Sequence, residues 1–115
     1  MLNQMVEYQP SQLDAVYSAI SHPVRRSLLG RLGPREAKVT ELAALYPISL
    51  AAVSKHIRVL ESAGLVRRTI TGREHRLALE PSPLMSAAMW LESYRRFWDD
   101  RLDLLEARLH RERNP

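Results

Sequence analysis

Ser54, Lys55 and His56 stand side by side in the stretch SKHIRVLESAGLVRR, and these residue types carry out chemistry in many proteins. A serine near a histidine suggests a nucleophile and its base, and a histidine is also a common metal ligand. On a helix, however, side chains two residues apart point about 200° away from each other, so Ser54 and His56 cannot hydrogen-bond through their side chains. Glu74 and His75 are adjacent in an expected hairpin, where successive side chains alternate between faces. The sequence therefore predicts a protein that is not an enzyme.

Cysteine and histidine usage bears on metal binding. The chain has no cysteine, which excludes a disulfide framework, a thiolate metal site and a thiol redox switch. Its histidines fall in four separate expected elements, at His22, His56, His75 and His110. We therefore predict no metal site and no cofactor.

Length and composition fit one globular domain with a modest core. The chain has 115 residues, of which 45% are hydrophobic and 26% are charged. No apolar run approaches the roughly 20 residues that span a bilayer. The N-terminal stretch MLNQMVEYQPSQLD lacks a basic region followed by an apolar one, so no signal peptide is expected. These features predict a cytoplasmic protein that has no membrane partner.

The excess positive charge is concentrated in the middle third of the chain. The net charge is +4, and residues 48–80 carry six Lys or Arg against three Asp or Glu. Residues 81–115 balance six against six. Most of the basic residues are arginines, whose forked guanidinium suits phosphates and guanine edges. This distribution agrees with a nucleic-acid partner but also with an ordinary solvated face.

Hydrophobic periodicity predicts four helices before residue 64. They are expected over residues 11–20, 23–32, 39–46 and 49–62. Pro23 suits the first helical position, Ser49 is a good N-cap, and Gly64 is a good helix end. A short helix, a turn and a second helix indicate a helix-turn-helix.

After Gly64 the period changes from helix to strand. VRRTI and HRLAL predict a β-hairpin over residues 66–79 around Gly72-Arg73, in the position of a wing. The expected buried side of the hairpin consists of Val66, Ile70, Leu77 and Leu79. One long helix follows over residues 84–111. The predicted fold class is therefore mainly α with a β-hairpin: four helices, the hairpin and a fifth helix.

The fourth helix has a core face and an outward face. At about 100° per residue, Val53, Ile57 and Leu60 cluster on one side and should face the core. Ala51, Lys55 and Arg58 lie opposite, while Ser54 and His56 lie on the two shoulders. A small, basic outward face fits the major groove of DNA, although a plain amphipathic helix with a solvated face is the alternative. Arg73 at the hairpin tip suits a minor groove, or is simply an exposed turn arginine.

The last helix carries a heptad-like apolar seam. Its members, spaced by seven, four, three and four residues, are Leu91, Trp98, Leu102, Leu105 and Leu109. Arg95 interrupts the seam at a position where an apolar residue is expected. Such a helix needs somewhere to bury its apolar face, either on its own domain or across a two-fold axis.

The stretches ISHPVRRSLLGRL, VTELAALYPISLAAVSKHIRVLESAGLVRR and TGREHRLAL resemble the ArsR-type winged helix-turn-helix repressors of bacteria. The resemblance runs from about Leu13 to Leu79, and WLESYRRFWDDRLDLLEARL resembles a cysteine-free branch of that family. It implies a single winged helix-turn-helix domain over 1–115, with a DNA-binding core (11–80) and a dimerisation helix (84–111). It also implies a homodimeric repressor that binds double-stranded DNA at an inverted repeat.

The chain departs from the metal-sensing members of that family. Where their cysteine motif lies, this sequence has Lys38-Val39-Thr40-Glu41-Leu42, and the last helix offers Asp99, Asp100 and Asp103 with His110 alone. No metal is expected, and an unknown small-molecule effector is a possibility that the sequence leaves open.

Candidate site residues follow from the helix phase, the hairpin and the resemblance. The expected DNA-binding residues are Arg26, Ser49, Ala51, Ser54, Lys55, His56, Arg58, Arg68 and Arg73. The expected dimer-interface residues are Leu13, Val16, Tyr17, Leu91, Trp98, Leu102 and Leu105. Arg25 is a further candidate for a phosphate contact. Arg26 could instead form an internal salt bridge, and His56 could steady the helix. The alternatives to a specific repressor are a protein-interaction adaptor and a non-specific nucleic-acid binder.

Overall fold

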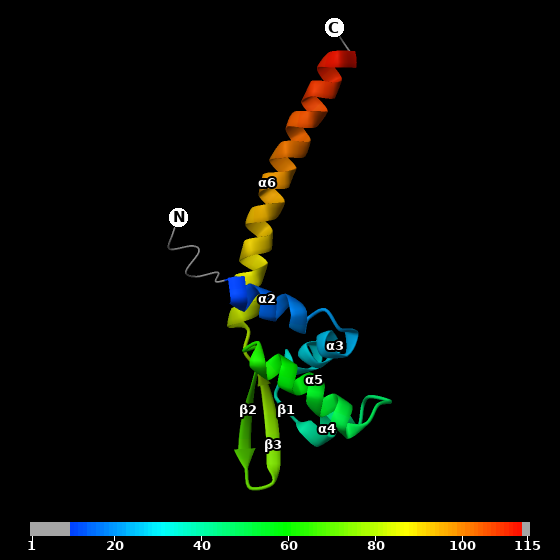
Figure 1. Ribbon diagram of the computed structural model, residues 1–115, viewed down its shortest axis with the longest axis vertical. Helices are drawn as coiled ribbons and strands as arrows, with labels where there is room; N and C mark the ends of the chain where they lie inside the picture. The colour runs from blue at the N-terminus through cyan, green and yellow to red at the C-terminus, as the bar shows by residue number, and fades with distance from the viewer. Residues whose placement is uncertain (1–9, 114–115) are drawn as a thin grey trace.

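The computed structural model describes residues 10–113 and has a compact end from which one long helix projects (Figure 1). Residues 1–9 belong to the N-terminal stretch in which no signal peptide is expected, and they lie outside the described residues. The elements are α2 (Pro10–Ala19), α3 (Pro23–Leu32), β1 (Ala37–Lys38), α4 (Val39–Ala43), α5 (Leu50–Ser62), β2 (Val66–Thr71), β3 (Glu74–Leu79) and α6 (Ser82–Arg113). The predicted fold class is confirmed.

Residues 10–80, here called the compact unit, contain nearly all of the buried core. The large side chains that are almost fully buried come from α2, α3, α5, the α5–β2 connection and β3: Val16, Leu28, Leu32, Val53, Ile57, Leu60, Leu65 and Leu77. No polar or charged residue is buried among the residues that the structure describes. The core therefore holds the two helices of the helix-turn-helix and the sheet as one body.

The start of α3 follows from three adjacent residues. Pro23 occupies the first helical position, where its missing N–H costs nothing. His22 is the N-cap, and its Nδ1 accepts a hydrogen bond from the backbone N–H of Val24 at 3.1 Å.

Both ends of α5 are fixed by local sequence. The hydroxyl of Ser49 accepts a hydrogen bond from the N–H of Ala52 at 3.1 Å, so the predicted N-cap is confirmed. At the other end Gly64 has a φ of +75°, and the N–H of Leu65 donates to the carbonyl of Leu60 at 3.0 Å. This is the Schellman arrangement, which needs a left-handed residue after the helix.

The sheet has three antiparallel strands in the order β1-β3-β2, whereas the sequence predicts two. Ala37 pairs with Leu77 and Lys38 pairs with Arg76, in the stretch between the helices expected over 23–32 and 39–46. The prediction missed β1 because a two-residue strand has no readable period. The added strand anchors the middle of β3 to the segment before α4.

The hairpin of β2 and β3 turns at Gly72-Arg73 as predicted. Gly72 has a φ of +62° and no non-glycine residue has a positive φ in the described chain, which fits a type II′ turn. Val66 and Leu77 are buried, but the prediction for Ile70 is wrong, since Ile70 is 58% exposed. Ile70 shares a face with Val66, yet it lies opposite His75 near the tip, where the hairpin has left the core.

Helix α6 leaves the compact unit after its first turns. The molecule measures 74 × 35 × 22 Å because this helix projects so far (Figure 1). Ala87 is its buried residue, and every side chain from residue 88 to residue 113 is exposed. We call residues 88–113 the projecting segment. In the described part of the chain, no helix is long and apolar enough to cross a membrane.

Candidate nucleic-acid interface

The outward face of α5 is small and basic, as its phase predicts. Val53, Ile57 and Leu60 are 0% exposed and hold the helix to the core. On the opposite side Ala51, Lys55 and Arg58 are exposed, and Ser54 is half-buried on the shoulder toward the wing. The face therefore has small side chains near its N-terminal end and cations in its middle.

Three cationic side chains on α5 and the wing form no polar contact within the described part of the protein. Within residues 10–113, Lys55, Arg58 and Arg73 take part in no ion pair or side-chain hydrogen bond. Lys55 and Arg58 project from α5, and Arg73 stands at the exposed turn of the wing. Charges that the fold does not neutralise are available to phosphates or base edges.

Arg68 differs from these three because its guanidinium is fully engaged. Its Nε and Nη2 donate to the two carboxylate oxygens of Glu61 at 3.2 and 2.7 Å, and its Nη1 lies 2.9 Å from Nδ1 of His75. Hydrogen bonding to Glu61 raises the pKa of Arg68 above its ordinary value. This bidentate pair joins β2 to the last turn of α5 and so fixes the wing relative to the outward face.

Arg25 and Arg26 cap the C-terminal end of α2. Arg25 donates from Nε to the carbonyl of Ala19 at 2.6 Å and from Nη2 to that of Ser18 at 3.0 Å. Arg26 donates from Nη1 to the carbonyl of Ile20 at 2.7 Å. The last carbonyls of a helix lack intrahelical partners and carry partial negative charge, so arginines satisfy them well. Both arginines donate to backbone carbonyls, and within residues 10–113 Arg26 forms no internal salt bridge, so its phosphate contact stays a prediction.

His56 points away from the outward face and packs on the start of α3. Its ring lies 4.3 Å from that of His22 between centroids, and its Nδ1 is 3.1 Å from Nη1 of Arg25. A guanidinium only donates, so Nδ1 of His56 accepts and the ring is neutral. Burial, with His22, Arg25 and Lys55 nearby, lowers the pKa of His56. Sequence phase places His56 on a shoulder but cannot reveal partners 31 and 34 residues away.

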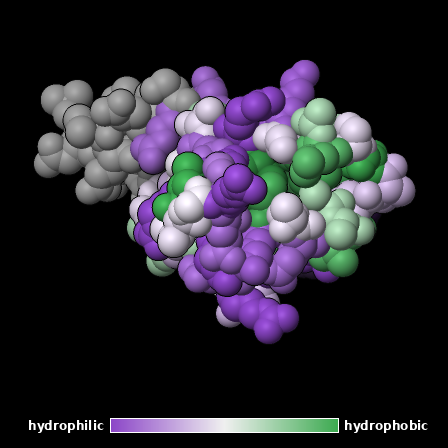
Figure 2. Space-filling model, turned by 90° about the horizontal axis from the view of Figure 1, so that it is seen from below, coloured by the Kyte–Doolittle hydropathy of each residue, from purple (hydrophilic) through white to green (hydrophobic). Residues whose placement is uncertain are grey.

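Two open clefts flank Arg58. One lies between α5 and the wing and is lined by Ser54, Arg58, Glu61, Ser62, Arg68, Ile70 and His75. The other lies between α2 and α5 and is lined by Ala15, Ser18, Lys55, Arg58, Val59, Ser62 and Ala63. Seen from the wing end, hydrophilic residues cover the middle of the molecule (Figure 2). Arg58 thus stands between two shallow, polar-edged hollows.

The other cations around the wing are neutralised by carboxylates. Nζ of Lys38 lies 2.9 Å from Glu74, and Nε of Arg76 lies 3.1 Å from Glu74. Hydrogen bonds from Lys38 and Arg76 lower the pKa of Glu74. Arg67 pairs with Glu80 at the base of the hairpin. These pairs leave Arg73 as the arginine of the wing that forms no ion pair within residues 10–113.

The residues assigned to a dimer interface fall into two groups. Val16 is 1% exposed and fills the core of its own protomer, while Leu13 and Tyr17 are half-buried. The Tyr17 hydroxyl donates to the carbonyl of Ala87 at 3.4 Å, which joins α2 to α6. On the projecting segment the remaining candidates are 48–58% exposed: Leu91, Trp98, Leu102 and Leu105.

Sequence reasoning missed an aromatic row beside this seam. Trp90 stacks on Tyr94 with centroids 5.3 Å apart, and Tyr94 contacts Phe97 and Trp98 at 6.3 and 6.0 Å. Tyr17 reaches the row from α2, with its ring 6.3 Å from that of Trp90. The spacing of three and four residues was the signal that could have found it.

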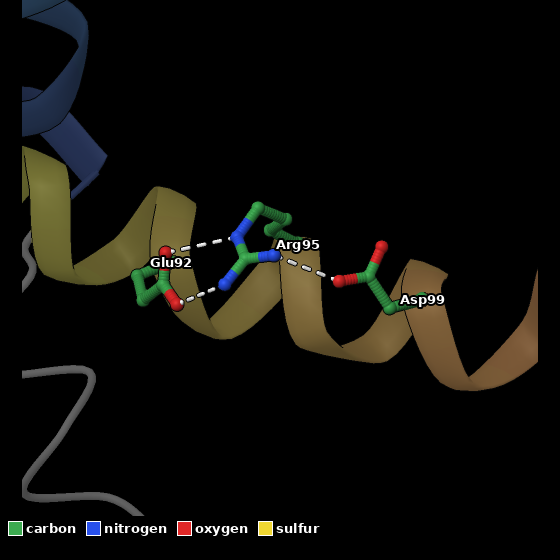
Figure 3. A network of polar contacts seen from close by, with 3 residues as sticks. All are labelled: Glu92, Arg95 and Asp99. Carbon is green, nitrogen blue, oxygen red and sulfur yellow. Dashed lines mark hydrogen bonds and ion pairs between the residues drawn. The ribbon is translucent and has the colours of Figure 1, made fainter.

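Arg95, which interrupts the seam, is neutralised within its own helix. Figure 3 shows its guanidinium between Glu92 and Asp99. It donates to the two oxygens of Glu92 at 3.0 and 2.6 Å and to Asp99 at 2.8 Å. The bidentate pair raises the pKa of Arg95 and lowers that of Glu92. Arg95 therefore does not bring an uncompensated charge to the apolar face.

Among the described residues, no group of three or more histidine, cysteine, aspartate or glutamate side chains could hold a metal ion. The features that remain are a helix-turn-helix with a small, cationic outward face and a cationic wing. They define a winged helix-turn-helix nucleic-acid-binding protein.

Comparison with known proteins agrees with this class. A family model described as a helix-turn-helix domain matches residues 20–69. The chain is 34% identical over 85 residues to the HTH-type transcriptional regulator Rv2034 of Mycobacterium tuberculosis, covering 74% of this chain and 77% of that protein. It is 33% identical to the transcriptional repressor SmtB homolog of Synechocystis, covering 68% of this chain and 59% of that protein.

Solved structures narrow the class to a family. A crystal structure of an ArsR family transcriptional regulator superimposes with a TM-score of 0.75 and 36% identity, covering 78% of this chain and 93% of that one. An ArsR-like transcriptional regulator from Rhodococcus superimposes with a TM-score of 0.72 and 32% identity, covering 84% and 92%. The chain belongs to the ArsR family of DNA-binding transcriptional regulators.

Proposed function

We propose that this regulator is a homodimeric repressor that binds an inverted-repeat operator. In each half-site α5 enters the major groove and the wing reaches the adjacent minor groove. The observation that carries the proposal is that Lys55 and Arg58 on α5 and Arg73 at the wing tip are exposed and form no ion pair in the described part of the chain. One of its relatives, the SmtB homolog, is a transcriptional repressor, which supports repression as the outcome of binding.

Within the proposed interface the residues have different roles. Ala51 and Ser54 allow α5 to approach the bases closely, and Lys55 and Arg58 contact bases or phosphates. Ser49 caps α5. Arg26, His56 and Arg68 are positioning residues in this proposal, because their polar groups are engaged inside the protein. DNA affinity then depends on both the contacting and the positioning residues, but only the contacting residues of α5 and the wing touch DNA.

A second copy of this chain is the partner that the apolar face of α6 fits best. The seam of Leu91, Trp98 and Leu102 is about half exposed, and the aromatic row lies beside it. A projecting helix with such a face needs a cover, and two copies related by a two-fold axis cover each other. Leu13 and Tyr17 of α2 extend the same surface. Two α5 helices would then lie about one DNA turn apart.

Footprinting on the DNA upstream of the protein's own gene tests the proposal. We expect protection of one short inverted repeat that survives an excess of random DNA. The double variant Lys55→Ala/Arg58→Ala should lose this protection at wild-type concentrations while it keeps the wild-type circular dichroism spectrum. Glu106→Ala, on the projecting segment, is the matched control and should bind normally.

Two outcomes would contradict the proposal. No mobility shift on any DNA at near-physiological salt would favour a protein-interaction adaptor. Equal affinity for operator and random DNA would favour a non-specific binder. Repetition with candidate small molecules tests for an effector that relieves repression, and fractionation of cells tests the expected cytoplasmic location.

A further inference from the structure

The first residue of α5 is a leucine that the fold leaves in solvent. Leu50 is 57% exposed, whereas Val53, Ile57 and Leu60 of the same helix are 0% exposed. Leu45 and Ile48, just before α5, are also exposed, at 53% and 40%. In Figure 2 an apolar patch lies on the side where Figure 1 places the α4–α5 connection.

Local structure does not require an apolar residue at position 50. Ser49 caps the helix, and Ile48 and Val53 stand at the two positions of a hydrophobic staple, directly before the cap and four residues after it. Leu50 occupies the first helical position, which accepts most residue types. Exposed apolar residues usually add little to stability, so the side chain of Leu50 is open to a contact outside the fold.

Leu50 shares one row of the helix surface with Ser54 and with Arg58, a cation of α5 that forms no ion pair in the described chain. Leu50, Ser54 and Arg58 follow one another at intervals of four, which is one row along the surface of a helix. Ser54 and Arg58 line the cleft between α5 and the wing. Leu50 continues that row to the N-terminal end of α5, and N-terminal residues of a recognition helix contact base edges.

We propose that Leu50 reads the C5-methyl group of a thymine in each operator half-site, an inference that rests on the proposed function. A leucine side chain has no hydrogen-bonding group, and the thymine methyl is the apolar group that base edges present in the major groove. A cytosine at that position has no methyl, and Leu50 could bond neither to its amino donor nor to the O4 acceptor of thymine, so the methyl contact is what distinguishes the two bases. Leu50 thus selects thymine over cytosine.

Removal of single methyl groups tests the inference. The operator is first isolated by selection from random duplex DNA with the full-length protein. Each thymine is then replaced in turn by deoxyuridine, which lacks the methyl, and affinity is measured by fluorescence anisotropy. For the wild type we expect one deoxyuridine position per half-site to weaken binding about four-fold, the effect of one buried methyl-sized group.

The variant Leu50→Ala completes a double-mutant cycle. It should bind the thymine operator about four-fold more weakly per half-site, show no further loss at the sensitive deoxyuridine position, and keep the wild-type melting temperature. Leu45→Ala, a neighbouring exposed leucine, should keep the full deoxyuridine penalty.

The inference is overturned if every deoxyuridine operator binds the wild type normally, or if Leu50→Ala retains the same penalty. Failure to select any DNA would instead refute the proposed function, and the reading role of Leu50 with it. A loss of stability in Leu50→Ala that accounts for the weaker binding would also overturn it.

Discussion

The compact unit and the projecting segment of α6 differ in the exposure of their apolar side chains. The compact unit buries Leu28, Leu32 and Ile57 almost completely. The projecting segment exposes every side chain, with tryptophans and leucines among them. The first region is stabilised by its own core, and the second acquires a core only when another surface covers it. Stability and assembly are therefore separable properties of this chain.

The largest effect should come from the core of the compact unit. Leu28→Ala removes a fully buried side chain and should lower the free energy of unfolding by about 2–5 kcal/mol. Leu104→Ala, at a position 69% exposed on α6, should change it by less than about 0.5 kcal/mol. Urea denaturation at fixed protein concentration measures both. Equal losses would mean that the two regions share one core.

Disruption of the α6 face should act on assembly instead. Trp98→Glu places a charge in the exposed apolar seam and should yield a monomer by analytical ultracentrifugation. Operator affinity should fall about 100-fold because two-site binding is lost. Arg96→Glu, on another side of the same helix, should remain a dimer. A dimeric Trp98→Glu protein would show that the seam is not the interface.

Substitution of the wing arginines Arg68 and Arg73 should distinguish a residue that positions the wing from one that contacts DNA. Arg68→Ala breaks the pair with Glu61 and should lower the free energy of unfolding by about 1–2 kcal/mol as well as weaken operator binding. Arg73→Ala should weaken binding about ten-fold and leave stability unchanged. Arg73→Ala should also reduce the salt dependence of binding, as expected for a lost phosphate or groove contact. If Arg68→Ala keeps wild-type stability, Arg68 belongs with the free cations.

The smallest effect should be on the pH dependence of stability, through the contact of His56 with α3. The pKa of His56 is lowered in the folded protein, so the unfolded chain takes up a proton first. The contribution of His56 to stability is therefore complete above its ordinary pKa of 6.5 and is lost as the pH falls from that value through the lowered pKa of the folded protein. Between pH 8 and pH 5, His56→Gln should show a weaker fall in urea midpoint than the wild type.

Local signals in the sequence predicted much of the fold. Pro23, Ser49 and Gly64 mark helix ends because each meets a backbone requirement of its own neighbourhood. The strand β1 was missed because its two residues gain their structure from β3, about 40 positions later. Ile70 was misplaced because alternation gives the face of a strand and not where the core ends.

The sequence predicted which side chains of α5 face outward but not which residues the site side chains contact. Helix phase separated Val53 and Ile57 from Lys55 and Arg58, since that requires only the helical period. Helix phase cannot distinguish an arginine that makes no internal contact from one that is held by hydrogen bonds. The roles of Arg68 and His56 depend on neighbours supplied by the fold, such as Glu61 and Arg25.

Both tryptophans of the chain, Trp90 and Trp98, lie on the projecting segment, and the compact unit has none. They are 37% and 48% exposed in the single chain. Indole emission shifts to shorter wavelength when water is removed from around the ring. The native protein thus carries its own spectroscopic reporter of association, and a dilution series read at the tryptophan band would follow pairing of chains without any label. Because Tyr17 of the compact unit contacts Trp90, a second probe such as far-ultraviolet circular dichroism would separate unfolding of that unit from association.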